Sequence, residues 1–485
     1  MAHEGFLYES ISQQLRSQIR GGSYQAGERL PSVRRLSQIF GVSINTVVQC
    51  FRQLEMDGFI DIRPRSGVFV ASTQPASPDS PVVAHFPLLP VEVSLSEDIL
   101  HYMEPHVEEH LVHLGIALPA REIMPIERIL RTLREVTRRQ PMDTWDYMHP
   151  HGHARFTHQL ARRSLNYPVP FTPEDLIITN GCMEAIELAL RTVTRRGDIV
   201  AVETPTYYGA LVALEVMQRK ALEIPTHYRD GMCLYSLEQA FKRGQVSACL
   251  VSCNAQNPLG FTMSAERKQK LVELATRYSV PLIENDIWGD TVSAGDSPPA
   301  KAYDEAGMVI YCNSFSKSLM PGMRLGWVAP GRFHHRLREL KQISSITTAS
   351  APQLLMGRLM ESGFYAQHVQ QLRQQLEAQT KETAAAVLDA FPPGTRIDIP
   401  TGGCVLWVGL PNRIDSRTLF DRALAGGIHI FRVFRRSKAF QLPAPECWHT
   451  YQPQAPAGNK PARGAGAEHL STRASAAQGS RAIPV

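Results

Sequence analysis

The stretch that decides the fold of the main domain reads Cys312-Asn313-Ser314-Phe315-Ser316-Lys317-Ser318-Leu319-Met320-Pro321-Gly322-Met323-Arg324-Leu325-Gly326-Trp327. It follows a short apolar run, 308–311, which is typical of a buried strand. An amine must lose its proton before it attacks an aldehyde, so Lys317 needs a pocket that lowers its pKa. Ser314 and Ser316 can donate to phosphate oxygens, and Arg324 adds a charged fork. A lone lysine on a loop is usually a solvated surface group. This string is more specific, and it predicts Schiff-base chemistry beside a phosphate.

Working outward, helical stretches alternate with short apolar runs from about residue 100 to 430. The runs are Leu176-Ile177-Ile178-Thr179, Ile199-Val200-Ala201-Val202, Ala248-Cys249-Leu250-Val251-Ser252, Pro281-Leu282-Ile283-Glu284 and Met308-Val309-Ile310-Tyr311. Strands separated by helices predict an α/β domain with a mostly parallel sheet.

Three further segments follow these strands. Residues 179–184 connect a strand to a helix, and the backbone N–H groups of Gly181, Cys182 and Met183 at that helix start form a phosphate seat. Tyr207 ends another strand and offers an aromatic face for a pyridine ring, although alone it would read as a core tyrosine. Asn257 supplies an amide for a phenolic oxygen, although alone Asn-Pro is an ordinary turn.

Together these segments resemble the fold-type-I enzymes that depend on pyridoxal 5'-phosphate (PLP), over residues 110–430. The resemblance implies that Lys317 forms the internal aldimine. It implies that Ser314, Ser316, Arg324 and the backbone at 181–183 hold the phosphate. It also implies that Tyr207 stacks on the ring and that Asn257 contacts the phenolic oxygen. No metal site is expected.

One departure from this pattern concerns the pyridine nitrogen. The family usually carries Asp, two residues, then Tyr after the strand that matches 281–283; the Asp pairs with the protonated nitrogen and makes the ring an electron sink. When this sequence is aligned with the family pattern on the aromatic residue, Asn285 takes the position of the Asp and Trp288 takes the position of the Tyr. A neutral Asn would weaken carbanion chemistry and leave aldimine formation intact. Asp286 substitutes if the turn shifts by one residue, and we favour it slightly because a buried pyridinium without a carboxylate is costly.

The N-terminal residues 1–71 have a different pattern. Pro31 begins a short helix with Val33, Leu36, Ile39 and Phe40 as its buried stripe, and Gly41 closes it in the left-handed conformation. Ser43 caps a second helix over 44–57, in which Val47, Val48, Phe51 and Leu54 face inward. Two helices around a short turn predict a helix-turn-helix. Residues 59–70 alternate around Pro64-Arg65-Ser66-Gly67, which predicts a β-hairpin wing with a basic tip.

This head resembles the GntR-type winged helix. The matching positions are Tyr8-Glu9 with Ile11 and Leu15, Gly27-Glu28-Arg29-Leu30-Pro31-Ser32-Val33-Arg34, Val42-Ser43 with Asn45-Thr46-Val47, and Leu54-Glu55 with Gly58-Phe59. The resemblance implies DNA contacts from Arg34, Ser43, Asn45, Thr46 and Gly67, although Thr46 alone could only pack and Gly67 could serve only the turn. Arg52, Arg63 and Arg65 can also reach backbone phosphate. Joined to the PLP-type domain, the whole chain resembles a MocR-type regulator.

Length, cysteine content and net charge limit the classes of function that are possible. The chain has 485 residues and eight scattered cysteines, none in a C-x-x-C pair, and neither a membrane span nor a secretory signal is expected, so we place it in the cytoplasm. Its net charge of +5 comes from residues 431–485, and the other 430 residues sum to −1, so DNA binding cannot be argued from overall charge. The expected domains are a head over 1–71, a linker over 72–105, a PLP-binding domain over 106–430, and an atypical tail over 431–485.

The tail is a second departure. After Gly427-Ile428-His429-Ile430 the fold type usually carries an Arg-Leu-Asn or Arg-Leu-Ser strand, whose Arg grips a substrate carboxylate. No such strand follows here, and none of Arg432, Arg435 or Arg436 can be assigned that role. Back-translation of residues 438–449 in another frame can encode an Arg-Leu-Asn segment. We therefore interpret the tail as disordered or as the product of a frameshift near Ile430, a hypothesis that incompatible codons would reject.

The sequence as a whole predicts a dimeric transcriptional regulator that binds double-stranded DNA and senses an amino acid or amine effector through aldimine exchange at Lys317. Two rivals stay open. One is an active aminotransferase with a fused head, and the other is a DNA-binding protein whose damaged PLP domain only dimerises. The effector, the operator and the sign of regulation are not encoded in any motif.

Overall fold

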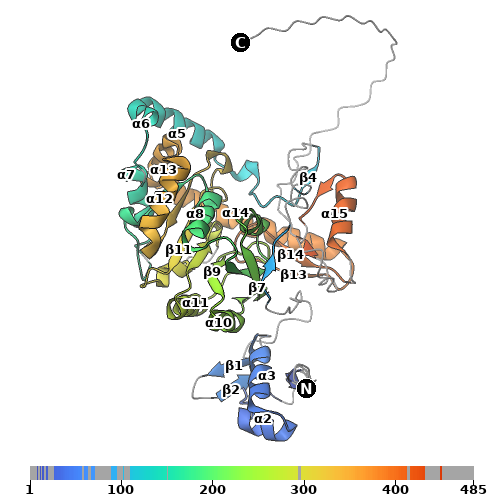
Figure 1. Cartoon of the computed structure of the whole chain (residues 1–485). Coiled ribbons are helices and arrows are strands. Elements are labelled where there is room, and N and C mark those ends of the chain that lie inside the picture. Colours follow the sequence, from blue (N-terminus) through green and yellow to red (C-terminus); the bar gives the residue numbers. More distant parts are fainter. Residues whose placement is uncertain are drawn as a thin grey trace, which may run out of the picture. The chain divides into compact units, whose positions relative to one another are not determined.

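The computed structural model describes residues 27–56, 59–63, 67–70, 89–94, 110–149, 151–165, 167–292, 297–411 and 415–431, together with scattered positions before residue 25, Tyr102 and Trp448–His449. Figure 1 shows a central sheet with helices on both of its faces. Of the residues described, none belongs to a helix both long and apolar enough to cross a membrane.

The central sheet confirms the expected α/β architecture. Its strands run in the order β3 (Val91–Glu92), β7 (Lys220–His227), β6 (Ile199–Thr204), β9 (Val246–Val251), β10 (Leu282–Asn285), β11 (Val309–Ser314), β12 (Gly326–Ala329) and β5 (Ile177–Thr179), and β8 (Gly231–Met232) pairs with β7. The strands from β7 to β11 are parallel to one another. All five predicted strands therefore lie in this sheet, mostly in parallel.

β12 was not predicted as a strand, and it runs antiparallel to both of its neighbours, β11 and β5. A Cβ atom at Gly326 would lie 2.6 Å from the backbone carbon of Gly181. Only a glycine allows this approach. The return of the chain through β12 therefore places the segment after Lys317 against the turn that precedes α8 (Cys182–Val193).

Apolar side chains fill both faces of the sheet. On one face, α8, α9 (Tyr208–Val216) and α12 (His334–Ser345) pack over Ile283, Ile310 and Val328. On the other, α10 (Leu234–Lys242) and α11 (Ala265–Tyr278) cover Leu282 and Val309. Parallel strands that are buried on both faces consist of continuous apolar runs, and these runs are what predicted the strands from the sequence. A third core joins α5 (Ile126–Arg139), α7 (Ala154–Arg163), α13 (Ser350–Glu361) and α14 (Phe364–Ala390).

Smaller elements complete this part of the chain. The helices are α6 (Pro141–Trp145) and α15 (Ser416–Ala425). β13 (Arg396–Asp398), β14 (Trp407–Gly409) and β16 (Trp448–His449) form a small antiparallel sheet. β4 (Val112–His113) pairs in parallel with β15 (Ile428–His429). Apart from Phe431 and β16, the predicted atypical tail lies outside the described residues.

The head contains the predicted helix-turn-helix and hairpin. α2 (Val33–Phe40) begins after Ser32 and ends at Gly41, whose φ of 64° is left-handed as expected. α3 (Ile44–Met56) is capped by Ser43, whose Oγ accepts the Thr46 N–H at 3.1 Å. β1 (Ile60–Arg63) and β2 (Gly67–Val70) form an antiparallel hairpin. The tip of the wing, including Arg65, lies outside the described residues.

The predicted buried stripe of the head needs one correction. Ile39 is 56% exposed and does not belong to the core, and Val48 is only half-buried. The core contains Leu36, Val47, Phe51 and Leu54 of the predicted residues. It also contains residues that precede α2, one more residue of α3, and residues of the hairpin and the turn before it: Ile11, Leu15, Ile19, Leu30, Cys50, Phe59, Ile60, Val68 and Val70. An eight-residue helix has barely two turns, so its apolar stripe is narrower than the 3.6-residue period suggested.

Candidate functional site

Lys317 lies just after the carboxyl end of β11, where it is half-buried. Its Nζ donates to the backbone oxygen of Ala117 at 2.6 Å and lies 5.3 Å from the centre of the Trp288 ring. Burial and the nearby Arg324 guanidinium lower the pKa of Lys317, Cys404 acts in the opposite direction, and the pKa falls to about 8 overall. About a tenth of this amine is therefore neutral at pH 7, far more than for an ordinary lysine. The requirement derived from the sequence, a lysine with a lowered pKa, is met.

The predicted phosphate seat gathers around the start of α8. Arg324 donates from Nη2 to the Asn180 backbone oxygen at 3.0 Å, and its Nη1 lies 3.5 Å from Ser316 Oγ. Ser314 Oγ donates to Ser316 Oγ at 3.2 Å. Gly181 has a φ of +86°, and a Cβ there would collide with Arg324. The fold thus places two hydroxyls, one guanidinium and the free N–H groups of a helix start around one point, which is the chemistry that binds a phosphate.

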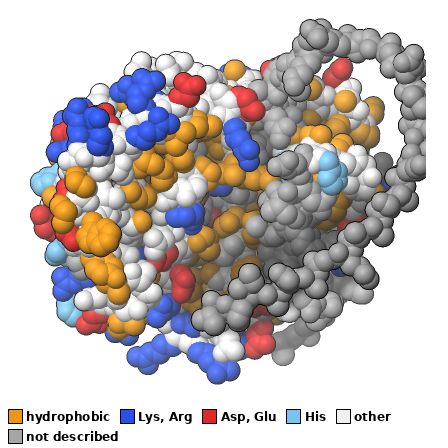
Figure 2. Space-filling model, turned by 90° about the horizontal axis from the view of Figure 1, so that it is seen from above, with side chains coloured by type: hydrophobic (Ala, Val, Ile, Leu, Met, Phe, Trp, Pro, Cys, Tyr) orange, Lys and Arg blue, Asp and Glu red, His pale blue; other side chains and the backbone are white. Residues whose placement is uncertain are grey.

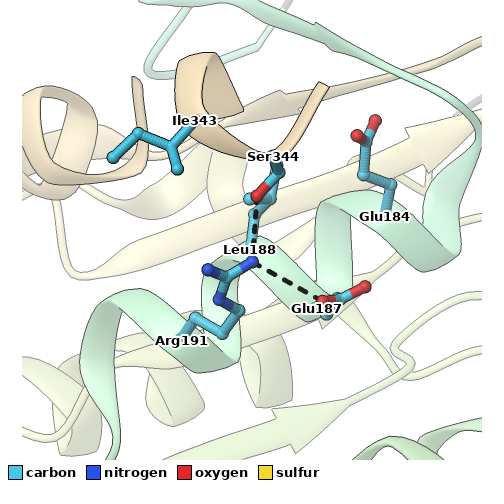
Figure 3. Close-up of a pocket in the computed structure, with 6 residues that line it drawn as sticks. All are labelled: Glu184, Glu187, Leu188, Arg191, Ile343 and Ser344. Carbon is cyan, nitrogen blue, oxygen red and sulfur yellow. Dashed lines mark hydrogen bonds and ion pairs between the residues drawn. The ribbon is translucent and has the colours of Figure 1, made fainter. Parts of the chain in front are cut away.

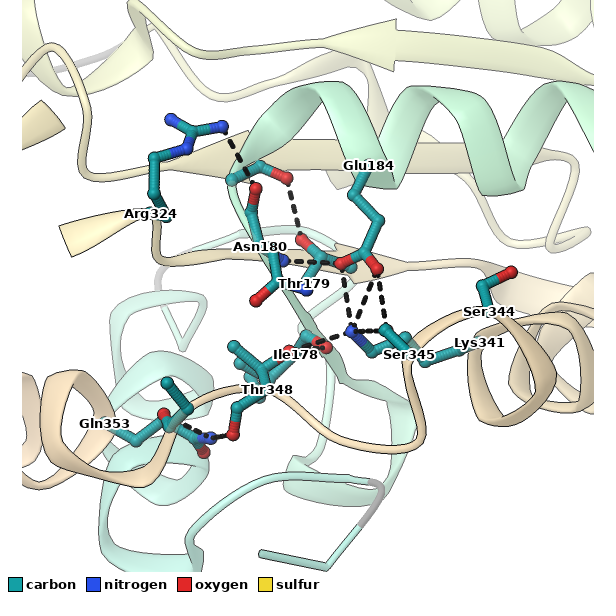
Figure 4. A network of polar contacts seen from close by, with 12 residues as sticks. Ile178, Thr179, Asn180, Glu184, Arg324, Lys341, Ser344, Ser345, Thr348 and Gln353 are labelled. Atoms are coloured by element: carbon teal, nitrogen blue, oxygen red, sulfur yellow. Dashed lines mark hydrogen bonds and ion pairs between the residues drawn. The ribbon is translucent and has the colours of Figure 1, made fainter. Parts of the chain in front are cut away.

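A buried ion pair that sequence reasoning missed fixes this seat, as Figure 4 shows. The Glu184 carboxylate accepts the Asn180 N–H at 2.5 Å and the Lys341 amine at 2.9 Å. Lys341 is fully buried and also donates to Ser345 and Thr348. Burial opposes ionisation of Glu184, but the hydrogen bonds from Asn180 and Lys341 lower its pKa overall. Glu184 and Arg324 therefore hold the N–H and the C=O of Asn180 from opposite sides.

Tyr207 and Asn257 lie on two loops that contact each other through Gln256. The hydroxyl of Tyr207 is close enough to interact electrostatically with Cys182 and Arg324. Asn257 is half-buried and precedes the cis-proline Pro258. Gln256, which sequence reasoning missed, joins the two loops: its Nε2 donates to the Pro205 oxygen at 2.9 Å and its Oε1 accepts the Leu259 N–H at 2.8 Å.

The two residues offered for the pyridine nitrogen point in different directions. Asn285 faces α8, and its Oδ1 accepts from Cys182 Sγ at 3.3 Å. Asp286 follows the opposite alternation of the strand, and its carboxylate accepts from Asn254 at 2.8 Å and Tyr311 at 2.9 Å. The slight preference for Asp286 therefore finds no support in the side-chain directions, because the turn does not shift. Trp288 is buried beside Lys317, and its indole has no phenolic oxygen to offer.

In the head, the residues predicted to contact DNA divide into two groups. Arg34, Ser43 and Asn45 are exposed, and Arg52 is half-buried. Thr46 is only 8% exposed, with its hydroxyl 2.8 Å from Ser43 Oγ, so packing and capping already account for it. Gly67 has a φ of +118°, and a Cβ there would lie 2.7 Å from Arg29 Nε, so it too has a structural reason.

A shallow pocket on the outside of α8 does not belong to this site. Figure 3 shows it between α8 and α12, where Arg191 bridges Ser344 Oγ at 2.9 Å and Glu187 at 3.7 Å. Its lining consists of Glu184, Glu187, Leu188, Arg191, Ile343 and Ser344. Apart from Glu184, which supports the seat from behind, these residues have no part in the geometry around Lys317.

Fold and site together define a winged-helix head joined to a domain of aminotransferase architecture. The family model described as "Aminotransferase class I and II" matches residues 112–439, and that of "Bacterial regulatory proteins, gntR family" matches residues 7–70. The chain is 35% identical over 425 residues to the uncharacterized HTH-type transcriptional regulator YdcR of Escherichia coli (strain K12), covering 87% of this chain and 90% of that one. It is 25% identical to the probable rhizopine catabolism regulatory protein MocR of Rhizobium meliloti, covering 89% and 87%.

Among solved structures, the chain resembles Pyrococcus horikoshii kynurenine aminotransferase in complex with PMP, with a TM-score of 0.66 and 27% identity over 75% of this chain and 90% of that one. The chain belongs to the MocR-type transcriptional regulators, which combine a GntR-type DNA-binding domain with an aminotransferase class I and II domain.

Gly181 provides a test of the phosphate seat. We expect Gly181→Ala to displace Arg324 and to weaken PLP binding by about 10-fold or more, roughly 1.4 kcal/mol. The measurement is a fluorescence titration of the full chain with PLP. Gly322→Ala is the matched control, because a Cβ at Gly322 meets nothing within 4 Å. Equal affinities for the two variants would contradict the assignment of the seat.

Lys341 provides a test of the buried pair. Lys341→Met leaves the Glu184 carboxylate without its cation, and we expect a loss of about 3 kcal/mol in the free energy of unfolding, read from urea denaturation. Lys381→Met breaks an exposed ion pair with Glu377 and should cost less than about 0.5 kcal/mol. If both variants unfold at the same urea concentration, the pair does not stabilise the seat.

Proposed function

We propose that this regulator binds PLP at Lys317 and uses the site to sense an amino acid or another primary amine. The observation that carries the proposal is the half-buried Lys317 amine, which donates to Ala117 and has a pKa lowered to about 8, on the same segment as the Arg324 and Ser316 side chains that meet at the start of α8. A structural lysine would not need such a seat beside it. A catalytic domain alone would not need the DNA-binding head.

The residues present fit PLP. The Gly181 turn leaves room for an anion where any other residue would fill the space, and Arg324, Ser314 and Ser316 supply donors to it. Tyr207 interacts with Arg324, and its match to the family position supports a role in covering the ring. The match of Asn257 to its family position supports a contact with the phenolic oxygen. These roles are carried by neighbouring loops on a single sheet edge, where α/β proteins bind ligands.

When bound, PLP supplies an aldehyde carbon that primary amines attack. Lys317 and an incoming amine compete for that carbon, and the lowered pKa gives Lys317 the neutral form needed to attack it. Lys317 joined to that carbon could no longer donate to Ala117, and an effector that displaced it would free the amine to take up a proton and donate to Ala117 again. Ala117 lies in the segment that pairs with β15 through β4, since Leu114 N and Gly115 N both donate to the His429 oxygen at 2.8 Å. Recovery of this contact is the differential interaction by which an effector would shift the conformation.

A homodimer fits both functions of the chain. Figure 2 shows a broad group of apolar side chains on the face seen from above. On and after α5 and α6, several large apolar side chains are exposed, with Trp145 at 84% and Tyr147 at 83%. Exposed apolar surface of this kind marks an association surface. Two copies related by a two-fold axis would present two heads to paired half-sites in double-stranded DNA.

The rival function is aminotransferase activity, which the likeness to kynurenine aminotransferase favours. It would require the ring to act as an electron sink. Asn285 provides no carboxylate for this, and the carboxylate-binding Arg-Leu-Asn strand is missing from the sequence. Regulation is therefore the function that the site supports better.

An absorbance experiment tests the proposal. We expect the full chain mixed with PLP to show a visible band that shifts when an effector amine is added, and Lys317→Ala to lose both the band and the shift. Lys381→Ala is the control, because Lys381 is an exposed lysine of α14 that pairs only with the exposed Glu377 in the described part of the chain. Release of a keto acid with conversion of the cofactor to its amine form would instead support the aminotransferase. Absence of any band in the wild type would reject both.

Arg34 provides a test of the head. We expect Arg34→Ala to weaken binding to operator DNA about 10-fold and to reduce the salt slope of log K by about one. Arg196→Ala, which removes an exposed arginine of the aminotransferase-type domain, is the control and should change neither. Gel-shift titrations at several salt concentrations make the measurement. A salt slope unaffected by Arg34→Ala would remove this residue from the DNA interface.

A further inference from the structure

The orientation of the Asn285 amide is determined by its neighbours. Its Oδ1 accepts from Cys182 Sγ at 3.3 Å and from the Ile287 N–H at 3.4 Å. A thiol and a backbone N–H both donate here, so the amide must turn its oxygen toward them and its NH₂ group away. That NH₂ group makes no hydrogen bond with the part of the chain that the structure describes. This N–H donor therefore lacks an acceptor among the described residues, and the side chain is only 8% exposed.

Asp286 is not available for the same task. Asn254 and Tyr311 each donate to one of its carboxyl oxygens. The amide of Asn254 is held in turn by Lys268, whose Nζ donates to Asn254 Oδ1 at 2.6 Å. This chain of contacts lies on the α11 side of β10, whereas Asn285 faces α8. Burial, together with the neighbouring Glu284, raises the pKa of Asp286 to about 8, so it is not a fixed negative charge at neutral pH.

We propose that Asn285 donates its amide N–H to the ring nitrogen of bound PLP and so keeps that nitrogen unprotonated. The inference rests on the proposed function, since it requires PLP at Lys317. A pyridinium N–H is a donor, and two donors facing each other repel. The lone pair of a neutral pyridine nitrogen is the acceptor that the Asn285 NH₂ group lacks.

The charges around the site favour the same state. Asp286, Arg324 and Lys317 all interact electrostatically with Cys182, the residue that fixes the Asn285 amide. The carboxyl oxygens of Asp286 already accept from Asn254 and Tyr311, so a protonated ring nitrogen would face the Asn285 amide without a carboxylate of its own to pair with. A neutral ring withdraws electrons poorly, so it supports carbanions poorly. It still presents its aldehyde to amines. The chain thus keeps the part of the chemistry that recognises an amine and loses the part that transforms it.

The protonation state can be read directly from PLP labelled with ¹⁵N in the ring and bound to the full chain. We expect the wild-type resonance in the range of neutral pyridine at pH 7.5, and an upfield shift to the pyridinium range in Asn285→Asp. Asp286→Asn is the matched control, the converse exchange at the next residue, and should leave the resonance in the neutral range.

Two outcomes would overturn the inference: a pyridinium resonance in the wild type, or an Asn285→Asp resonance that does not move. Either leaves the proposed function standing, provided that the visible band still depends on Lys317. If no band and no bound ¹⁵N signal appear at all, the proposed function itself fails, and the inference fails with it. The wild-type measurement is decisive even if a variant does not fold.

Discussion

The approach of Arg324 to the turn before α8 is the contact on which the rest of the site depends. It joins the segment that carries Lys317 to the helix start that can receive a phosphate. This contact requires particular residues both at the turn and in the strand that passes it. Gly181 has to lack a Cβ, Gly326 has to let β12 pass against the same turn, and Asn180 has to be held from behind by the Glu184–Lys341 pair. A lysine beside an ordinary strand-helix turn would be a surface amine, whereas here burial lowers the pKa of Lys317.

A second constraint links the two ends of the domain. The backbone oxygen of Ala117 accepts a hydrogen bond from the Lys317 amine, and Ala117 belongs to a segment that is paired with β15 near residue 430. Tyr102 strengthens this connection, because its hydroxyl donates to the Gly115 oxygen at 2.7 Å and its ring packs with Phe420 and Phe431. Hydrogen bonds therefore connect Lys317 to residues far away in sequence. Under the proposed function, this connection is the route by which the state of Lys317 would reach the rest of the domain.

Asn285 and Trp288 are the two residues at which this site departs from the aminotransferase pattern. Both lie where the aminotransferase pattern expects an ionised aspartate and a tyrosine. Their side chains supply a neutral donor and an aromatic surface instead. Under the proposed function, both replacements would leave amine binding possible and remove groups that accelerate the later steps of transamination. The DNA-binding head joined to this domain is consistent with a pocket that reports occupancy.

The sequence by itself determined the head, the mostly parallel sheet and the segment that carries Lys317, because these depend on local periodicity and on motifs with strict spacing. It could not place Ile39, since one turn of a short helix decides whether that residue is inside. It also left Asn285 and Asp286 as alternatives, since strand alternation at the end of β10 decides which side chain faces α8. Lys341, Gln256 and Ala117 have no local signature at all. Only the tertiary structure brings them to the site, because their roles arise from hydrogen bonds between segments that are distant along the chain.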